Sequence, residues 1–114
     1  MEKERKYKRW HLSKPLKIID KKSGKHIGNI TDITVAGLGM ISKYPLISNI
    51  TLQLRIDLSN EKFPLDDIEL DAKNVWCEEN EIVDRYYAGM EFEDISGKME
   101  ERIKELIERF GFTT

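Results

Sequence analysis

Two short segments of this chain carry residue types suited to binding a nucleotide anion. The first places Arg5 and Arg9 four residues apart in a charge-dense stretch at the start of the sequence, and the second runs from Asp32 through Thr34 to Gly37. Arginine presents a planar fork of donors that matches phosphate oxygens and the O6/N7 edge of guanine. A carboxylate beside a hydroxyl accepts from the N1–H and N2–H₂ donors of guanine. A glycine lets a planar ligand approach the backbone closely. The pattern predicts a site for an anionic, guanine-bearing small molecule.

These two segments resemble the motif of the PilZ family, bacterial β-barrel domains that bind the second messenger cyclic di-GMP. The family motif is R-x-x-x-R on an N-terminal segment, followed some tens of residues later by [D/N]-x-S-x-x-G. Arg5 and Arg9 match the first half. Asp32 and Gly37 match the second half, and Thr34 stands where serine is usual. R-x-x-x-R alone has almost no value as an indication, but both halves in this order form a fairly specific pattern.

The resemblance continues through the second half of the chain. Val75-Trp76, followed by residues 87–92 (Tyr-Ala-Gly-Met-Glu-Phe), is similar to the late strands of the family, which often end in G-[V/I]-x-F. The resemblance therefore covers nearly the whole sequence. It implies a mainly β fold, a small six-stranded antiparallel β-barrel with a flexible basic N-terminal arm and one C-terminal α-helix.

The resemblance also implies which residues bind cyclic di-GMP. Arg5 and Arg9 would bind guanine edges and phosphates, and Asp32 would accept from the N1/N2 edge of guanine. Thr34 would add a hydroxyl contact beside Asp32, because residues i and i+2 of a strand share a face. Gly37 completes this expected binding set.

Three further residues near the arginines are auxiliary candidates: Lys6, Lys8 and Trp10. The lysines would neutralise part of the phosphate charge. Trp10 has two interpretations, stacking on a guanine face or sealing the barrel where the arm enters the first strand. Packing is the favoured interpretation.

Alternating apolar and polar residues predict the strands of the barrel. The clearest run, residues 50–58, places its apolar residues on one face and its polar residues on the other, so we expect a half-buried strand. A slip of phase near residues 73–76 predicts a β-bulge. The other predicted strands cover residues 16–20, 26–34, 37–42, 67–76 and 86–92.

The last part of the chain changes to a helical period. Its apolar residues form one stripe of a helix: Met99, Ile103, Leu106, Ile107 and Phe110. Ser96 is the expected N-cap and Gly111 the expected C′ residue. We therefore divide the single domain into an arm (residues 1–13), a barrel (residues 14–94) and a helix (residues 95–114).

The net charge of −2 hides an uneven distribution along the 114 residues. Residues 1–28 hold ten Lys and Arg residues against three acids, whereas the remainder holds nine against eighteen. A basic arm on an acidic body favours local capture of an anionic ligand over coating of nucleic acid. The alternative is a solvated basic tail.

The sequence lacks the residues that several classes of function require. Two histidines and the single Cys77 are too few for a usual metal site, and the sequence contains no Walker A loop, G-x-S-x-G or H-E-x-x-H. We therefore predict a protein that is not an enzyme, with no catalytic residues, metal or cofactor. The lone cysteine, the lack of a secretory signal and the lack of a spanning apolar run predict a cytoplasmic protein without membrane insertion.

The leading functional prediction is a cyclic di-GMP receptor or adaptor. Ligand binding would order the arm, and the domain would then signal to a separate, unidentified protein in control of motility, exopolysaccharide or adhesion. One alternative is a degenerate PilZ-like protein-interaction domain without nucleotide binding, which Thr34 favours. The other is a nucleic-acid-binding barrel of the OB type, which the acidic body argues against. The expected oligomeric state is monomer or homodimer, because the apolar stripe of the helix could either cover one end of the barrel or form a dimer interface.

Overall fold

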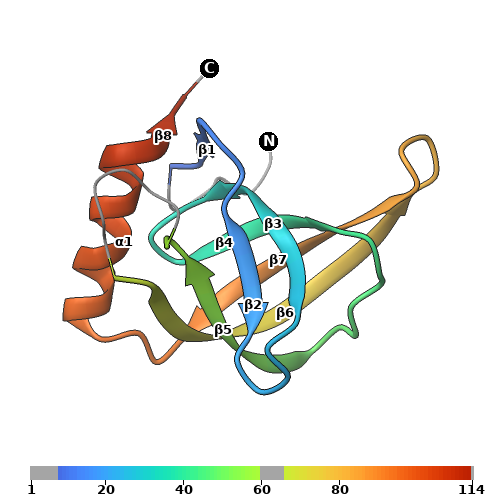
Figure 1. Ribbon diagram of the computed structural model, residues 1–114, viewed down its shortest axis with the longest axis horizontal. Helices are drawn as coiled ribbons and strands as arrows, with labels where there is room; N and C mark the ends of the chain where they lie inside the picture. The colour runs from blue at the N-terminus through green and yellow to red at the C-terminus, as the bar shows by residue number, and fades with distance from the viewer. Residues whose placement is uncertain (1–7, 60–65, 114) are drawn as a thin grey trace, which may run out of the picture.

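The computed structural model describes residues 8–59 and 66–113. It contains eight strands and one helix within these residues. They are β1 (Trp10–Leu12), β2 (Lys17–Asp20), β3 (His26–Ile33), β4 (Gly37–Ser42), β5 (Ile50–Asp57), β6 (Ile68–Asn80), β7 (Arg85–Glu93), α1 (Gly97–Phe110) and β8 (Gly111–Phe112). Figure 1 shows the strands curving around one core, with α1 at one end.

Six of the strands form a closed antiparallel barrel. Their order is β2-β5-β6-β7-β4-β3, and the pairing of β2 with β3 closes the ring. The strands β1 and β8 extend the sheet beyond β3, because the last residues of β3 pair with β1 instead of β2. The predicted six-stranded barrel with one C-terminal helix is confirmed.

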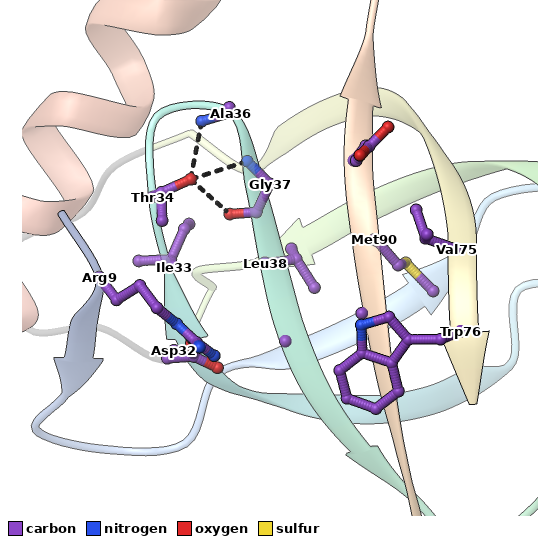
Figure 2. A pocket seen from close by; sticks show the side chains of 13 residues that line it. Arg9, Asp32, Ile33, Thr34, Ala36, Gly37, Leu38, Val75, Trp76 and Met90 are labelled. Atoms are coloured by element: carbon purple, nitrogen blue, oxygen red, sulfur yellow. Dashed lines mark hydrogen bonds and ion pairs between the residues drawn. The ribbon is translucent and has the colours of Figure 1, made fainter. Parts of the chain in front are cut away.

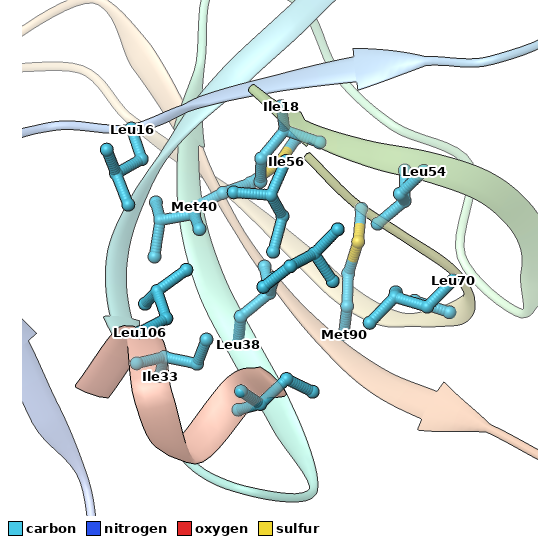
Figure 3. Close-up of a cluster of buried hydrophobic side chains, with 14 of the residues drawn as sticks. Leu16, Ile18, Ile33, Leu38, Met40, Leu54, Ile56, Leu70, Met90 and Leu106 are labelled. Carbon is cyan, nitrogen blue, oxygen red and sulfur yellow. The ribbon is translucent and has the colours of Figure 1, made fainter. Parts of the chain in front are cut away.

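The barrel interior is filled by the apolar positions of the alternating strands. Leu54 and Ile56 of β5 are fully buried, while Arg55 between them lies partly exposed on the outer face. Burial of such side chains supplies the main driving force for folding. Figure 3 shows Leu106 of α1 beside Ile33 and Leu38, so the helix stripe covers the end of the barrel near the β3–β4 turn.

The helix begins as the sequence predicts but ends differently. Ser96 is the N-cap, and its Oγ accepts a hydrogen bond of 3.1 Å from the backbone N–H of Met99. Gly111 follows the last helical residue as expected, but it adopts an extended conformation (φ −85°, ψ 147°) and opens β8. A Cβ at Gly111 would lie 2.6 Å from the carbonyl oxygen of Ile107. Close packing against the last helical turn thus explains the glycine. The segment 95–114, expected to be helical, also contains the short strand β8.

The end of the expected arm, residues 1–13, belongs to the sheet. In β1, Trp10 pairs with Ile33 and His11 pairs with Asp32 of β3. On its other side β1 pairs with β8, where His11 faces Phe112. The chain is therefore anchored from Trp10 onward, and any free arm is shorter than predicted.

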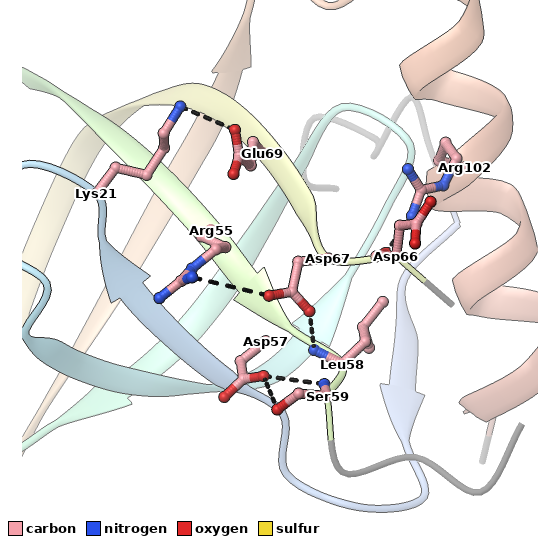
Figure 4. A network of polar contacts seen from close by, with 9 residues as sticks. All are labelled: Lys21, Arg55, Asp57, Leu58, Ser59, Asp66, Asp67, Glu69 and Arg102. Carbon is pink, nitrogen blue, oxygen red and sulfur yellow. Dashed lines mark hydrogen bonds and ion pairs between the residues drawn. The ribbon is translucent and has the colours of Figure 1, made fainter. Parts of the chain in front are cut away.

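Polar contacts join the end of β5 to the start of β6 on the outer surface (Figure 4), and Arg102 of α1 donates to the backbone carbonyl of Asp66 beside them. Asp67 accepts a 2.7 Å hydrogen bond from the backbone N–H of Leu58 and lies 3.9 Å from the Arg55 guanidinium. Beside it, the hydroxyl and the backbone N–H of Ser59 donate to the Asp57 carboxylate at 2.6 and 2.9 Å. These two bonds lower the pKa of Asp57, the hydroxyl contributing most.

The β6 strand has the irregularity that the phase slip predicts. Its register against β7 shifts between Asn74 and Trp76, which confirms the β-bulge. The strand runs on to Asn80, four residues beyond the predicted strand 67–76. The β6–β7 hairpin therefore projects further from the barrel than the sequence pattern indicates (Figure 1).

Candidate functional site

The turn between β3 and β4 is built around the side chain of Thr34. Its Oγ1 accepts hydrogen bonds from the backbone N–H groups of Ala36 (2.9 Å) and Gly37 (3.1 Å), and its own N–H donates to the Gly37 carbonyl at 2.8 Å. Figure 2 shows the contacts of the Thr34 hydroxyl with the N–H groups of Ala36 and Gly37 and with the Gly37 carbonyl, to which it donates at 3.4 Å. Threonine hydroxyls form such turns by replacing a backbone acceptor. A serine would supply the same oxygen, so threonine at this position leaves the turn intact.

The structure brings Arg9 and Asp32 together. The Nε of Arg9 donates to Asp32 Oδ2 at 2.6 Å, and the Arg9 Nη2 also contacts this oxygen. The other carboxylate oxygen accepts from the Thr31 hydroxyl at 2.9 Å. The Asp32 side chain is only 10% exposed and that of Arg9 is 45% exposed. The guanidinium therefore covers a nearly buried carboxylate while part of its own donor set still faces solvent.

Three glycines keep the surface beside this ion pair free of side chains. Gly39 of β4 pairs directly with Gly89 of β7. A Cβ at Gly39 would lie 2.3 Å from Asp32 Oδ1, and a Cβ at Gly89 would lie 2.3 Å from the indole Nε1 of Trp76. Gly37 has a different constraint, since its Cβ would lie 2.2 Å from the backbone oxygen of Met90. The predicted Gly37 is thus required by the close approach of β4 to β7.

These features form one open pocket of about 290 Å³ (Figure 2). Arg9 and Asp32 lie at one side, and Trp76, which is 43% exposed, lies at the other. The floor is the backbone of the paired glycines. The full lining comprises Arg9, Asp32, Ile33, Thr34, Ala36, Gly37, Leu38, Gly39, Val75, Trp76, Gly89, Met90 and Glu91. A cationic fork, an exposed aromatic plane and a flat floor suit a planar base that carries an anion.

The sequence of the chain matches the family description of the PilZ domain over residues 3–109. The chain belongs to the PilZ domain family. PilZ domains are receptor and adaptor domains. No curated protein matches the sequence.

Solved structures share the fold of this PilZ domain at low identity. The Bacillus subtilis inhibitor of motility MotI/DgrA is 18% identical with a TM-score of 0.72, and the match covers 94% of this chain and 51% of that protein. Escherichia coli YcgR in complex with c-di-GMP is 15% identical with a TM-score of 0.72, over 92% of this chain and 45% of YcgR. The isolated PilZ domain of YcgR with c-di-GMP is 13% identical with a TM-score of 0.73, over 94% and 91%. The chain thus spans about half the length of the first two proteins.

The remaining predicted site residues of the PilZ domain lie in different places. Arg5 and Lys6 are outside the described residues. The Lys8 Nζ lies 4.9 Å from the centre of the Trp10 ring, and Trp10 packs against the core. Of the described candidates, four line the pocket: Arg9, Asp32, Thr34 and Gly37.

Sequence reasoning did not assign Trp76 to the site. The available signals were the phase slip in residues 73–76 and the position of this tryptophan before the late strand. Because of the bulge after Asn74, the indole lies over Gly89 on the outer face. An exposed aromatic ring offers a plane on which a nucleobase can stack.

Two other kinds of site are lacking within the part of the chain that the structure describes. No group of three His, Cys, Asp or Glu residues there is arranged to hold a metal ion. The one helix among the described residues, α1, is too short and too polar to cross a membrane.

Proposed function

We propose that this PilZ domain is a cyclic di-GMP receptor and that the pocket between Arg9 and Trp76 is its ligand site. The observation that carries the proposal is the contact of Arg9 with Asp32 at the edge of a glycine floor. The two halves of the family motif, more than twenty residues apart in sequence, supply adjacent side chains here. The match of the family motif to Arg5 adds this residue to the proposed ligand set.

The donor inventory supports a guanine-bearing anion. Arg9 uses Nε and Nη2 on Asp32, which leaves its Nη1 hydrogens for a phosphate or for the O6/N7 edge of guanine. Asp32 supplies carboxylate acceptors for guanine N1–H and N2–H₂ once a ligand replaces the bonds from Arg9 or Thr31. Trp76 offers the plane on which a base can stack, which contributes about 1–3 kcal/mol per base.

Strand β1 connects the proposed ligand site to the C-terminus. Arg9 directly precedes β1, and β1 lies between β3 and β8. The His11 ring lies 5.8 Å from the Phe112 ring, centre to centre. A ligand that binds Arg9 would therefore alter the surface shared by β1, β8 and α1. We infer that a separate cytoplasmic protein recognises this altered surface.

The pathway in which that partner acts is proposed by analogy with a solved relative. The solved relative MotI/DgrA is named as an inhibitor of motility. Control of motility, exopolysaccharide or adhesion is accordingly the proposed output, exerted by binding and without catalysis.

Calorimetric titration with cyclic di-GMP tests the receptor proposal. We expect a dissociation constant of about 1 μM or tighter, a binding free energy of about −8 kcal/mol or better. Cyclic GMP, GTP and cyclic di-AMP should bind more weakly. Arg9→Ala should weaken binding at least about tenfold, the loss of one bidentate arginine contact. Lys98→Ala, at an exposed position on α1, is the matched control and should leave affinity unchanged.

The absence of binding heat at ligand concentrations of hundreds of micromolar would refute the receptor proposal. It would favour the degenerate protein-interaction domain instead. An equal effect of Arg9→Ala and Lys98→Ala would show that general charge, and not this pocket, attracts the ligand.

A further inference from the structure

The end of the barrel opposite α1 contains a second pocket. Helix α1 covers the end where β3 finishes at Ile33, whereas β3 begins at His26, about 23 Å away at 3.3 Å per residue. A pocket of about 500 Å³ lies at this opposite end and opens beside Ser42 and Arg85. An adjoining hollow of about 470 Å³ shares His26, Ser42 and Tyr44 with it. Both volumes fall within the range of small-molecule sites in proteins, which include the mouths of β-barrels.

The charged side chains that line this barrel-mouth pocket and the adjoining hollow are basic. Lys43 and Arg85 line the pocket, Lys25 lines the hollow, and none of the described lining residues of either is acidic. This is unusual for a chain with 21 acidic residues and a net charge of −2. Neither lysine forms an ion pair within residues 8–59 and 66–113. Arg85 uses one Nη1 bond on the Asp84 carbonyl and retains its other donors.

A buried hydroxyl adds a directed donor to the same pocket. Ser42 is only 3% exposed, and it lines both the pocket and the adjoining hollow. Its Oγ accepts a 3.1 Å hydrogen bond from the backbone N–H of Tyr44. The hydroxyl hydrogen can rotate toward a ligand atom in the pocket, so Ser42 can donate a hydrogen bond to an acceptor there.

The other walls of the pocket are apolar or aromatic. Ile27, Ile41 and Leu46 provide aliphatic surface. The Tyr44 side chain is 69% exposed at the rim, where a tyrosine ring can cover a planar ligand. Charge at the rim, a buried hydroxyl and apolar walls together specify a ligand with an anionic group and a flat apolar body.

We propose that the barrel mouth binds a small organic anion, a planar apolar ring bearing one phosphate or carboxylate group. This site is independent of the proposed cyclic di-GMP site, because the two pockets share no lining residue. The strands β3, β4 and β7 nevertheless contribute to both.

An NMR titration of ¹⁵N-labelled protein with phenyl phosphate tests the proposal. At constant ionic strength we expect saturable shifts at the amides of Gly28, Ser42 and Tyr44. The dissociation constant should be about 1 mM or lower, as for a good ligand of this size. Inorganic phosphate and benzyl alcohol, which carry only one half of the proposed ligand chemistry, should each bind at least about fivefold more weakly. Benzoate in place of phenyl phosphate identifies whether a carboxylate or a phosphate is preferred.

Matched charge variants distinguish the pocket from nonspecific attraction. Lys43→Ala/Arg85→Ala should weaken phenyl phosphate binding at least about fivefold. Lys98→Ala/Lys104→Ala also removes two positive charges, but from α1, and should leave affinity unchanged. Tyr44→Ala, at an exposed position, gives a second test if the first variant does not fold.

Three results would overturn the proposal. The first is shifts that do not saturate by about 10 mM phenyl phosphate, ten times the expected dissociation constant. The second is shifts confined to Gly37 and Gly39, which would place the ligand in the other pocket. The third is equal weakening by the two charge variants.

Discussion

Replacing Gly89 by alanine tests whether the indole of Trp76 forms part of the ligand site. The added Cβ would lie 2.3 Å from Nε1 and 2.5 Å from Cε2 of Trp76, far closer than any stable contact. The obstacle is a side chain that is already 43% exposed, so the indole can swing outward into solvent. We therefore expect Gly89→Ala to remove the aromatic plane from the pocket and to leave the barrel strands in place.

The expected loss of affinity follows from the stacking that disappears. An aromatic ring stacked on a base contributes about 1–3 kcal/mol, so cyclic di-GMP should bind about 5- to 150-fold more weakly. The free energy of unfolding should change by less than about 1 kcal/mol, because alanine is intrinsically favoured over glycine within a strand and offsets part of the repacking. Binding and stability should therefore respond differently to this one methyl group.

Calorimetry on Gly89→Ala, Trp76→Ala and the double variant provides the decisive measurement. In the Trp76→Ala background no ring remains to be displaced, so adding Gly89→Ala should cost little further affinity. Gly37→Ala is the contrasting control, since its Cβ would meet the Met90 backbone oxygen at 2.2 Å and should destabilise the fold itself. Equal losses of affinity from Gly89→Ala in both backgrounds would refute the reasoning, because distortion of β7 would then account for them.

Three further predictions concern stability and titration. Ser96→Ala should lower the free energy of unfolding by about 1 kcal/mol through loss of the N-cap, measured by urea denaturation, and an unchanged midpoint would contradict it. Thr34→Val should cost about 1–2 kcal/mol because two backbone N–H groups lose their acceptor, whereas Thr34→Ser should be nearly neutral in the same assay. Because the pKa of Asp57 is lowered in the folded state, its ionised carboxylate stabilises the fold at pH values above the unfolded pKa of about 3.8. This stabilisation is lost as the pH falls through the folded pKa. Ser59→Ala should raise the pKa of Asp57 towards 3.8, as ¹³C NMR titration would show, and an unaltered titration would argue against the hydroxyl as the cause.

The main strands were predictable because each is long enough to show a period of two. Residues 50–58 alternate over the whole of β5, and the phase slip located the bulge in β6. The strands β1 and β8 have three and two residues, too few for any period to be visible. Their pairing brings residues near both ends of the chain together, so it depends on tertiary packing that local sequence does not encode.

The lining of the candidate pocket was predictable only where a motif marks its residues. Arg9, Asp32 and Gly37 follow from the family pattern, but the physical reason for Gly37 is packing against the β7 backbone. The contribution of Gly89 and Trp76 depends on cross-strand register. Trp76 lies opposite Gly89 only because the bulge shifts the pairing of β6 with β7. A sequence pattern shows that a bulge exists, but the three-dimensional pairing determines which ring it places on the outer face.

The Arg9–Asp32 contact also constrains how tightly the proposed ligand can bind. Asp32 is nearly buried and both of its oxygens already accept hydrogen bonds, so a guanine that approaches its carboxylate must replace existing bonds. Their loss offsets part of the new contact energy. Net affinity therefore depends on contacts that only the ligand adds, namely the remaining Arg9 donors, the Trp76 plane and the charge of Arg5. For this reason substitutions at the aromatic side of the pocket should affect affinity as strongly as those in the arginine motif.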